Sequence, residues 1–254
     1  MVTGAATFPE VLRAAPGALD LHAVAGTYAF YDDGWPGRLL VARRGPDVEA
    51  TLRSYRFGAD YPAVVRVGGH GPHHVEVVVP GFNELPEQVF SGWFFGDGAK
   101  GFAGVTDWKG QEFGFFARRT RPHDLYRRSG TRSPNAGDGP EPVDARSAAA
   151  IGPGAFAGSW AVCCHGSRAT LELRDEPGRL AGTWSVAGQP YEVAVAGPDP
   201  GAPEHRLAFD VLGVAGLAAP PRFTGYLFTR PRNAVAGTVD VAGTPFGCYL
   251  TRVA

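Results

Sequence analysis

The chain has few cysteines and almost no net charge, and each of these two features excludes a class of protein. Its 254 residues include 3 cysteines, and 24 Lys+Arg balance 25 Asp+Glu, so the formal net charge is −1. Three cysteines cannot make a disulfide framework, and a nearly neutral chain has no overall basic field to attract nucleic acid. We therefore expect a reducing, cytoplasmic location and no nucleic-acid partner.

Long apolar runs are also missing. No run approaches the roughly 20 residues that a membrane span needs. The first residues lack the cationic start and unbroken apolar stretch of a secretory signal. We therefore expect no membrane association, and we do not interpret these first residues as a secretory signal.

Several well-known catalytic motifs are absent as well. The chain contains no Gly-rich phosphate loop, no Gly-x-Ser-x-Gly elbow, no His-Glu-x-x-His and no Cys-x-x-Cys. Their absence argues against nucleotide hydrolysis, α/β-hydrolase chemistry and zinc-protease chemistry. We expect a protein without cofactors that binds or transforms a small ligand.

Glycine and proline, by contrast, are abundant, with 36 and 22 residues. Between them apolar residues alternate with a period of two, and turn residues interrupt the pattern roughly every eight to twelve residues, as in sandwiches and barrels. Helix is expected only as a turn or two after Pro9. The expected strands are 24–31, 38–42, 48–54, 61–67, 73–79, 87–95, 101–108 and 111–119, followed by 156–162, 168–174, 179–186, 189–196, 205–211, 221–229, 234–241 and 244–252.

The two halves of the chain repeat each other. From Phe90 the sequence FSGWFFGDGAKGFAGVTDWKGQEFGFFARR aligns without a gap with FTGYLFTRPRNAVAGTVDVAGTPFGCYLTR from Phe223. The starts pair too, AGTYAFYDDGWPGRLLV from Ala25 with AGSWAVCCHGSRATLEL from Ala157. Agreement in register at both ends predicts a duplication.

Eight sequential antiparallel strands can close into a barrel, which removes both edges of the sheet. Between the copies, the Pro, Gly, Ser and charge content is typical of a flexible linker. We predict an all-β chain of two tandem antiparallel eight-stranded barrels, with an N-terminal extension at 1–22, a first barrel at 23–119, a linker at 120–154 and a second barrel at 155–254.

Two short motifs resemble those of the calycin barrels. The second copy opens with GSW at 158–160 and continues with LAGTW at 180–184, and the first copy has GTY at 26–28. A Gly-x-Trp strand followed by a Leu-x-Gly-Thr-aromatic strand is more similar to avidin-like proteins than to lipocalins. The resemblance implies an eight-stranded calycin-like barrel in which Trp160 plugs one end.

The polar set that holds biotin in avidin-like barrels is not found in this chain. Its positions fall on Val162 and Ser167 in the second copy and on Phe30 and Trp35 in the first. Biotin binding is therefore not implied. A second, purely architectural similarity is to small calycin-like cyclases of polyketide and related pathways, some of them pericyclic, and fold alone does not give function.

The first copy is richer in aromatic residues than the second. It has ten Phe between residues 30 and 116, against five in the second copy. Core packing accounts for part of this content, and the excess predicts an aromatic-lined pocket for an apolar small molecule. The predicted substrate-binding residues are Tyr28, Trp35, Trp93, Phe95, Phe113 and Phe115.

Polar residues between these aromatics are the candidate catalysts. Tyr31 and the indole N–H of Trp108 are donors that could polarise a carbonyl group. Glu76 lies in the middle of a strand of valines, where it either faces solvent or is a buried carboxylate with a functional role. We predict Tyr31, Glu76 and Trp108 as catalytic residues.

A histidine cluster follows Gly69. His70, His73 and His74 could offer imidazoles to a metal. However, His73 and His74 should point to opposite faces of a strand, and no acidic or cysteine partner lies beside them in sequence. We predict a solvated turn and no metal site.

The cysteines suggest a nucleophile or a disulfide, but buried thiols that pack as small hydrophobes are the favoured reading. Cys163 and Cys164 should face opposite sides of one strand, so at most one enters the barrel. If the second barrel closes, its first and last strands are neighbours, and Cys248 then meets one of the two.

Three functions stay open. The protein is a cofactor-free cyclase that holds a flexible apolar substrate in a reactive conformation, or a carrier of a hydrophobic molecule, or an interaction module with filled barrels. Convergent polar groups in one aromatic pocket favour the cyclase, and an exposed apolar patch favours the interaction module. The unequal divergence of the copies favours the cyclase, and the oligomeric state is left open.

Overall fold

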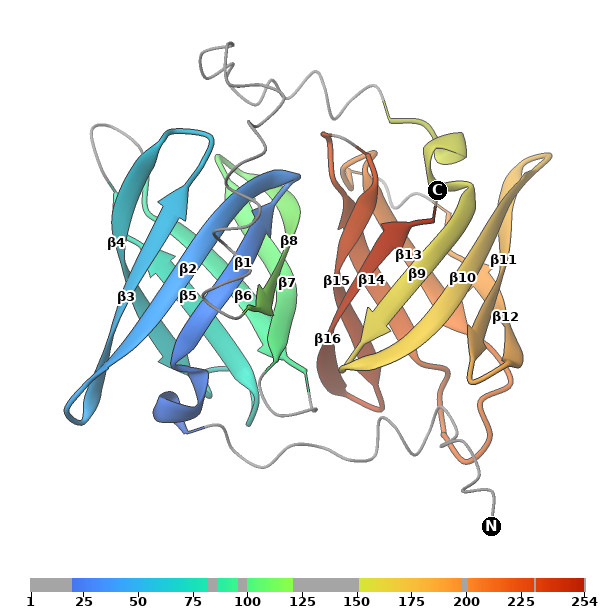
Figure 1. Cartoon of the computed structure of the whole chain (residues 1–254). Coiled ribbons are helices and arrows are strands. Elements are labelled where there is room, and N and C mark those ends of the chain that lie inside the picture. The colour runs from blue at the N-terminus through green and yellow to red at the C-terminus, as the bar shows by residue number, and fades with distance from the viewer. Residues whose placement is uncertain are drawn as a thin grey trace.

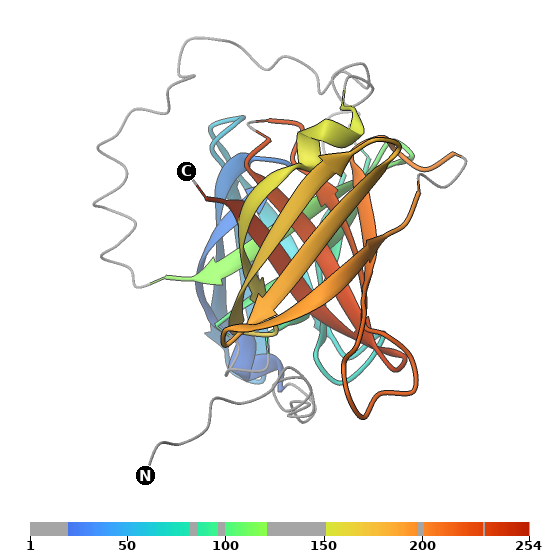
Figure 2. The same cartoon turned by 90° about the vertical axis from the view of Figure 1, so that its right-hand side faces the viewer.

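The protein folds into two closed antiparallel barrels that stand side by side (Figures 1 and 2). The computed structural model describes residues 20–81, 86–95, 100–120, 151–197, 201–230 and 232–253. Each strand pairs with the next, and in each barrel the last strand pairs with the first. The predicted all-β fold of two tandem eight-stranded barrels is confirmed, while the helix expected after Pro9 lies outside the described residues.

The strands of the first barrel are β1 (Gly26–Asp32), β2 (Trp35–Arg44), β3 (Asp47–Ser54), β4 (Ala59–Val67), β5 (His74–Val79), β6 (Gln88–Phe94), β7 (Gly101–Trp108) and β8 (Gln111–Arg119). Those of the second are β9 (Gly158–Cys164), β10 (Ser167–Glu176), β11 (Arg179–Val186), β12 (Gln189–Val195), β13 (Arg206–Val211), β14 (Arg222–Leu227), β15 (Ala234–Val241) and β16 (Thr244–Arg252). β2 is longer than expected because Pro36 is only its second residue, where a missing N–H is tolerated.

A short 3₁₀ helix and a large aromatic residue close one end of each barrel. In the first, η1 (Leu21–Val24) accepts a 2.7 Å hydrogen bond from the Tyr28 hydroxyl at the Val24 carbonyl. In the second, η2 (Pro153–Phe156) accepts a 2.9 Å bond from the indole N–H of Trp160 at the Phe156 carbonyl. The predicted plugging role of Trp160 is thereby confirmed.

These caps extend the ordered parts beyond the predicted boundaries. η1 begins at Leu21, before the boundary at 23, and Ile151 is buried in the core of the second barrel, before the boundary at 155. Apolar residues next to a barrel end bury against it, although the local sequence resembles a linker. The remainder of the predicted linker lies outside the described residues.

The interiors of the two barrels are filled differently. The strand registers place Leu52 opposite Leu39 in the first barrel and Trp184 opposite Leu171 in the second. They likewise place Val77 opposite Phe90 in the first barrel, and Phe209 opposite Phe223 in the second. The second barrel thus carries two large aromatic side chains at positions where the first has aliphatic ones.

The barrels pack together through β6–β8 of the first and β14–β16 of the second. A cluster of buried side chains fills this interface, formed by Phe95, Ala103, Phe116, Phe228, Ala234, Ala236 and Tyr249. The rings of Phe116 and Tyr249, at equivalent positions of the repeat, stack with centroids 4.4 Å apart. The two copies are thus joined by a pseudo-twofold interface.

Glycine allows the two backbones to approach closely. A Cβ at Gly114 would lie 2.5 Å from the carbonyl oxygen of Ala236 and 2.9 Å from that of Tyr226. The repeat-equivalent Gly247 faces the backbone of Trp93 and Ala103 in the same way. Backbone atoms cannot move aside as a flexible side chain can, so these positions need a residue without a Cβ.

The substitution Gly114→Ala tests this close approach. We expect it to lower the free energy of unfolding by about 1–3 kcal/mol, because the new methyl group overpacks the interface between the barrels. Denaturant unfolding followed by tryptophan fluorescence measures the change. Gly197→Ala is the matched control, since a Cβ there meets nothing within 4 Å. Equal stability of the two variants would contradict the proposed role of Gly114.

Candidate functional site

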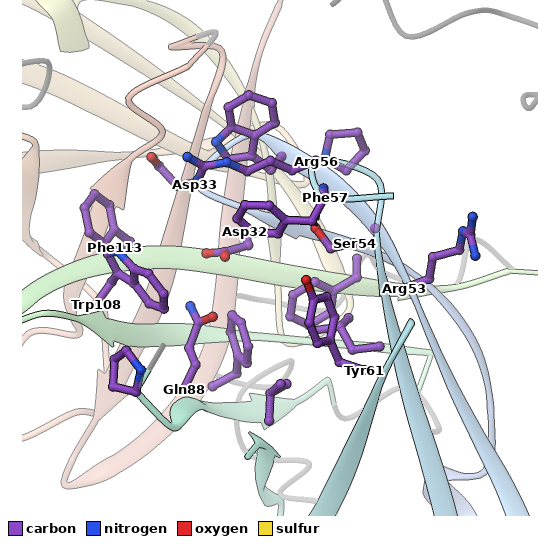
Figure 3. Close-up of a pocket in the computed structure, with 18 of the residues that line it drawn as sticks. Asp32, Asp33, Arg53, Ser54, Arg56, Phe57, Tyr61, Gln88, Trp108 and Phe113 are labelled. Carbon is purple, nitrogen blue, oxygen red and sulfur yellow. Dashed lines mark hydrogen bonds between the residues drawn. The ribbon is translucent and has the colours of Figure 1, made fainter. Parts of the chain in front are cut away.

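A cavity of about 110 Å³ opens at the end of the first barrel opposite η1 (Figure 3). It is bounded by the ends of β1, β3, β6 and β7 and by the segments that follow β3 and β5. A cavity wall built mainly from aromatic and other apolar side chains favours an apolar ligand with few polar groups. The aromatic residues in the wall are Phe30, Trp35, Phe57, Tyr61, Phe90, Trp108 and Phe113.

The hairpin between β1 and β2 places two adjacent carboxyl groups at this cavity. Asp32 is the last residue of β1 and points inward, on the same face as Tyr28 and Phe30. Asp33 and Gly34 form the turn with φ angles of 45° and 84°, which is the backbone of a tight two-residue hairpin. Figure 3 shows Asp32 between Phe57 and Gln88, inside the cavity.

Asp33 is held by the second barrel. Its side chain is only 4% exposed, and its carboxylate accepts a 2.6 Å hydrogen bond from the backbone N–H of Thr229 and a second bond from the hydroxyl of Thr229. Thr229 follows β14. One wall of the cavity is therefore fixed by the interface between the barrels.

Burial changes the acidity of both carboxyl groups. It raises the pKa of Asp32 to about 6, against the opposing effects of a hydrogen bond from Gln88 and the charge of Arg56. Burial also raises the pKa of Asp33 to about 7, opposed by the hydrogen bonds from Thr229 and assisted by repulsion from Asp32. Both groups therefore change charge near neutral pH, where a general acid or base is most effective.

Arg56 is the cation of the site. Its guanidinium carbon lies 4.6 Å from the centre of the Trp35 ring and 5.0 Å from that of Phe57. Burial lowers the pKa of Arg56, and the charges of Asp32 and Asp33 act in the opposite direction. The cation is thus packed on aromatic faces, where its position is set by stacking and by the acid pair.

Three of the predicted site residues line the cavity. Trp35, Phe113 and the proposed catalytic residue Trp108 lie in its wall. Two more, Tyr28 and Phe115, are fully buried inside the same barrel, but they do not line the cavity. All nine predicted residues belong to the first barrel; five of them face its interior, and three of these five line one pocket.

The other four predicted residues lie on the outside of the first barrel. Tyr31 stacks on Phe116 at the barrel interface, and Phe95 belongs to the interface cluster. Trp93 packs against His74, and Glu76 lies next to Arg66. They do not share a pocket with Trp108, so their predicted grouping with it is corrected. Alternation along a strand sends Tyr31 outward and its neighbour Asp32 inward.

Sequence reasoning did not identify Asp32, Asp33, Arg56 and Gln88 as site residues. A polar pair before a Gly resembles an ordinary hairpin turn, and the distance along the chain from Asp32 to Arg56 hides their proximity. One signal was present. The repeat aligns Asp32 and Asp33 with Cys164 and His165, so these positions differ in chemistry between the copies.

The histidine cluster is not a solvated turn. His70 is exposed, but His73 and His74 are 1% and 0% exposed. The His73 ring donates a 2.7 Å hydrogen bond to the carbonyl of Pro245 in the second barrel. The prediction failed because packing between the barrels buries a segment whose sequence is typical of a loop.

The cysteine prediction is confirmed in the second barrel. Cys248 on β16 lies directly opposite Cys164 on β9, and both are buried free thiols, while Cys163 is half-buried. Burial and the neighbouring Cys164 raise the pKa of Cys248. A raised pKa keeps the thiol protonated and disfavours a nucleophilic role.

Comparison of the chain with protein-family models and with curated proteins found no match. Among solved structures, a similar one is the crystal structure of a protein of unknown function of the DUF3598 family from Nostoc punctiforme. The identity is 13% and the TM-score 0.31, over 92% of this chain and 97% of that chain. Within the described residues no helix is long and apolar enough to cross a bilayer. The chain is a tandem pair of closed eight-stranded antiparallel barrels.

The acid pair should make stability depend on pH. A carboxyl whose pKa is raised on folding binds a proton more tightly in the native state, so stability falls as the pH rises from about 4 to about 7. We expect Asp32→Asn to reduce this loss by on the order of 2 kcal/mol, since the amide cannot ionise.

Denaturant unfolding at a pH of about 4.5 and at a pH of about 7.5 tests this expectation, because most of the loss of stability falls between these two values. The exposed Asp47→Asn serves as the control for the loss of one carboxylate. If the wild type and Asp32→Asn lose the same stability between the two pH values, the burial of Asp32 is not what sets its acidity.

Proposed function

We propose that the first barrel binds a small, largely apolar molecule and promotes a cofactor-independent acid–base reaction of it, such as a cyclisation. The observation that supports this proposal is the pair of carboxyl groups, Asp32 and Asp33, whose pKa values are about 6 and about 7 in an aromatic-lined cavity. Perturbed carboxyl groups in a concave apolar site are a mark of general acid or base catalysis.

In the proposed reaction Asp32 is the group that moves the proton. Its carboxylate takes a proton from a carbon next to a carbonyl group, the resulting enolate attacks an electrophilic carbon of the same molecule, and the proton returns to the product. Asp33, held by Thr229, stays beside it and tunes its acidity. The aromatic wall holds the chain in a folded conformation, which lowers the entropy cost of ring closure.

Two side chains are suited to the charge that develops on the oxygen of the enolate. Arg56 is a cation in the cavity wall, and Trp108 carries an indole N–H in the same wall. A positioned donor is worth more in a cavity that excludes water than in solution. The predicted catalytic role of Trp108 therefore remains part of the proposal, and Arg56 joins it.

A carrier for a hydrophobic molecule is the second candidate. The observation that favours it is the predominance of apolar side chains in the cavity wall. A carrier needs the wall and not the acidity of Asp32, so the two functions differ in the effect of Asp32→Asn. For either function we propose a cytoplasmic location, because three cysteines in 254 residues do not make a disulfide framework.

Binding of an apolar ketone tests the pocket. We expect β-tetralone to bind the full-length protein and to quench its tryptophan fluorescence, because Trp35 and Trp108 lie in the cavity wall. The substitution Leu52→Trp introduces the side chain that fills the second barrel at the equivalent position, and it should abolish binding without unfolding the protein. Unchanged affinity in a folded Leu52→Trp variant would show that the ketone binds elsewhere.

Exchange of the α-protons of the same ketone in D₂O tests the chemistry. We expect the protein to accelerate this exchange, with a rate that rises through a pH of about 6 as Asp32 ionises. Asp32→Asn should retain binding and lose roughly 100-fold or more of the acceleration, a typical contribution of a general base. Full binding without any acceleration by the wild type would favour the carrier.

A further inference from the structure

We propose that the outer face of the first barrel binds one divalent transition-metal ion, such as Zn²⁺, through His70, His74 and Glu76. These residues each offer one ligand atom, and the three atoms lie within 4.8 Å of one another. His74 and Glu76 lie on the same face of β5, and His70 belongs to the loop that precedes this strand. The site is separate from the cavity, because it lies on the outer face of the barrel wall and the cavity is enclosed by the inner face.

The hydrogen bonding of His74 favours this interpretation. The ring is 0% exposed, and its Nε2 atom lies 2.9 Å from the hydroxyl oxygen of Ser91. The other ring nitrogen, Nδ1, is buried and has no hydrogen-bond partner. A buried polar atom without a partner costs free energy, and a metal ion would satisfy it.

The arrangement is that of a metal-binding histidine with an outer-shell partner. Such histidines commonly use the second ring nitrogen for a hydrogen bond that fixes the orientation of the ring, as Ser91 does here.

Glu76 divides its two oxygens between different neighbours. Its Oε1 atom lies 3.9 Å from Nε2 of His70, and its Oε2 atom lies 3.9 Å from the guanidinium of Arg66. Oε1 is therefore available to an ion between the three residues, while Arg66 stays on the other side of the carboxylate. Because His70 is exposed and in a loop, its ring can rotate by the small amount that shorter metal bonds require.

Two imidazoles and one carboxylate are the ligand set of several zinc sites, in which water completes the coordination. The ion would tie the loop that contains His70 to β5. The same loop carries His73, whose ring donates a hydrogen bond to Pro245 of the second barrel. Metal binding would thus stabilise the segment that joins the two barrels on this side.

Titration of the full-length, chelator-treated protein with Zn²⁺ tests the site. Calorimetry should give one equivalent of binding at pH 7, and Zn²⁺ should raise the melting temperature of the wild type. His70→Ala and Glu76→Gln should each weaken binding at least about tenfold, as expected for the loss of a ligand, and Ser91→Ala should weaken it by roughly tenfold through the orientation of His74.

His22→Ala is the control for the loss of one imidazole, because His22 in η1 is not one of the three grouped residues and its loss should leave the affinity unchanged. Titration with Co²⁺ identifies the ligands, since coordination by His and Glu gives d–d absorption without a thiolate charge-transfer band. Absence of binding, binding that survives both His70→Ala and Glu76→Gln, or a thiolate band would each overturn the proposal. The variants leave the cavity intact, so ketone binding is a check that they are folded.

Discussion

Contact between two backbones, made possible by Gly114 and Gly247, is the constraint on which the rest of the structure depends. A Cβ at Gly114 would collide with main-chain carbonyl groups of the second barrel, so the barrels can lie this close only where both copies have a glycine. At this distance the Asp33 carboxylate reaches Thr229, and the His73 ring reaches Pro245. The interface thus orders one wall of the cavity and buries polar groups that a single barrel would expose.

The duplicated scaffold has been used for two different interiors. In the second barrel Trp184 and Phe209 fill the space, and Cys164 occupies the position that Asp32 holds in the first. In the first barrel Leu52 and Val77 occupy the equivalent positions, and Leu52 lines the cavity. The difference is one of side-chain volume and polarity on an unchanged backbone, which is how a fold keeps its stability while one copy acquires a site.

The acid pair is costly for the fold. Asp32 and Asp33 have raised pKa values because the folded protein withdraws them from water, and this withdrawal disfavours their charged forms at neutral pH. The second barrel avoids the cost with Cys164, a thiol buried as a small hydrophobe. This difference between the copies at the position of Asp32 is the feature on which the proposed function of the first barrel rests.

Sequence patterns were enough to predict the duplication, the strands and the closed barrels, because a period of two and a repeated register can be read directly from the chain. The tryptophan plug was implied by the resemblance to calycin barrels. The site was predicted only in part. Trp35, Trp108 and Phe113 line the cavity, whereas Tyr31 and Glu76 face outward, since the face of a strand reverses with one residue. The proximity of Asp32 to Arg56, the burial of His73, and the grouping of His70 with Glu76 follow from barrel closure and from contact between the barrels, and these bring together residues that no local pattern relates.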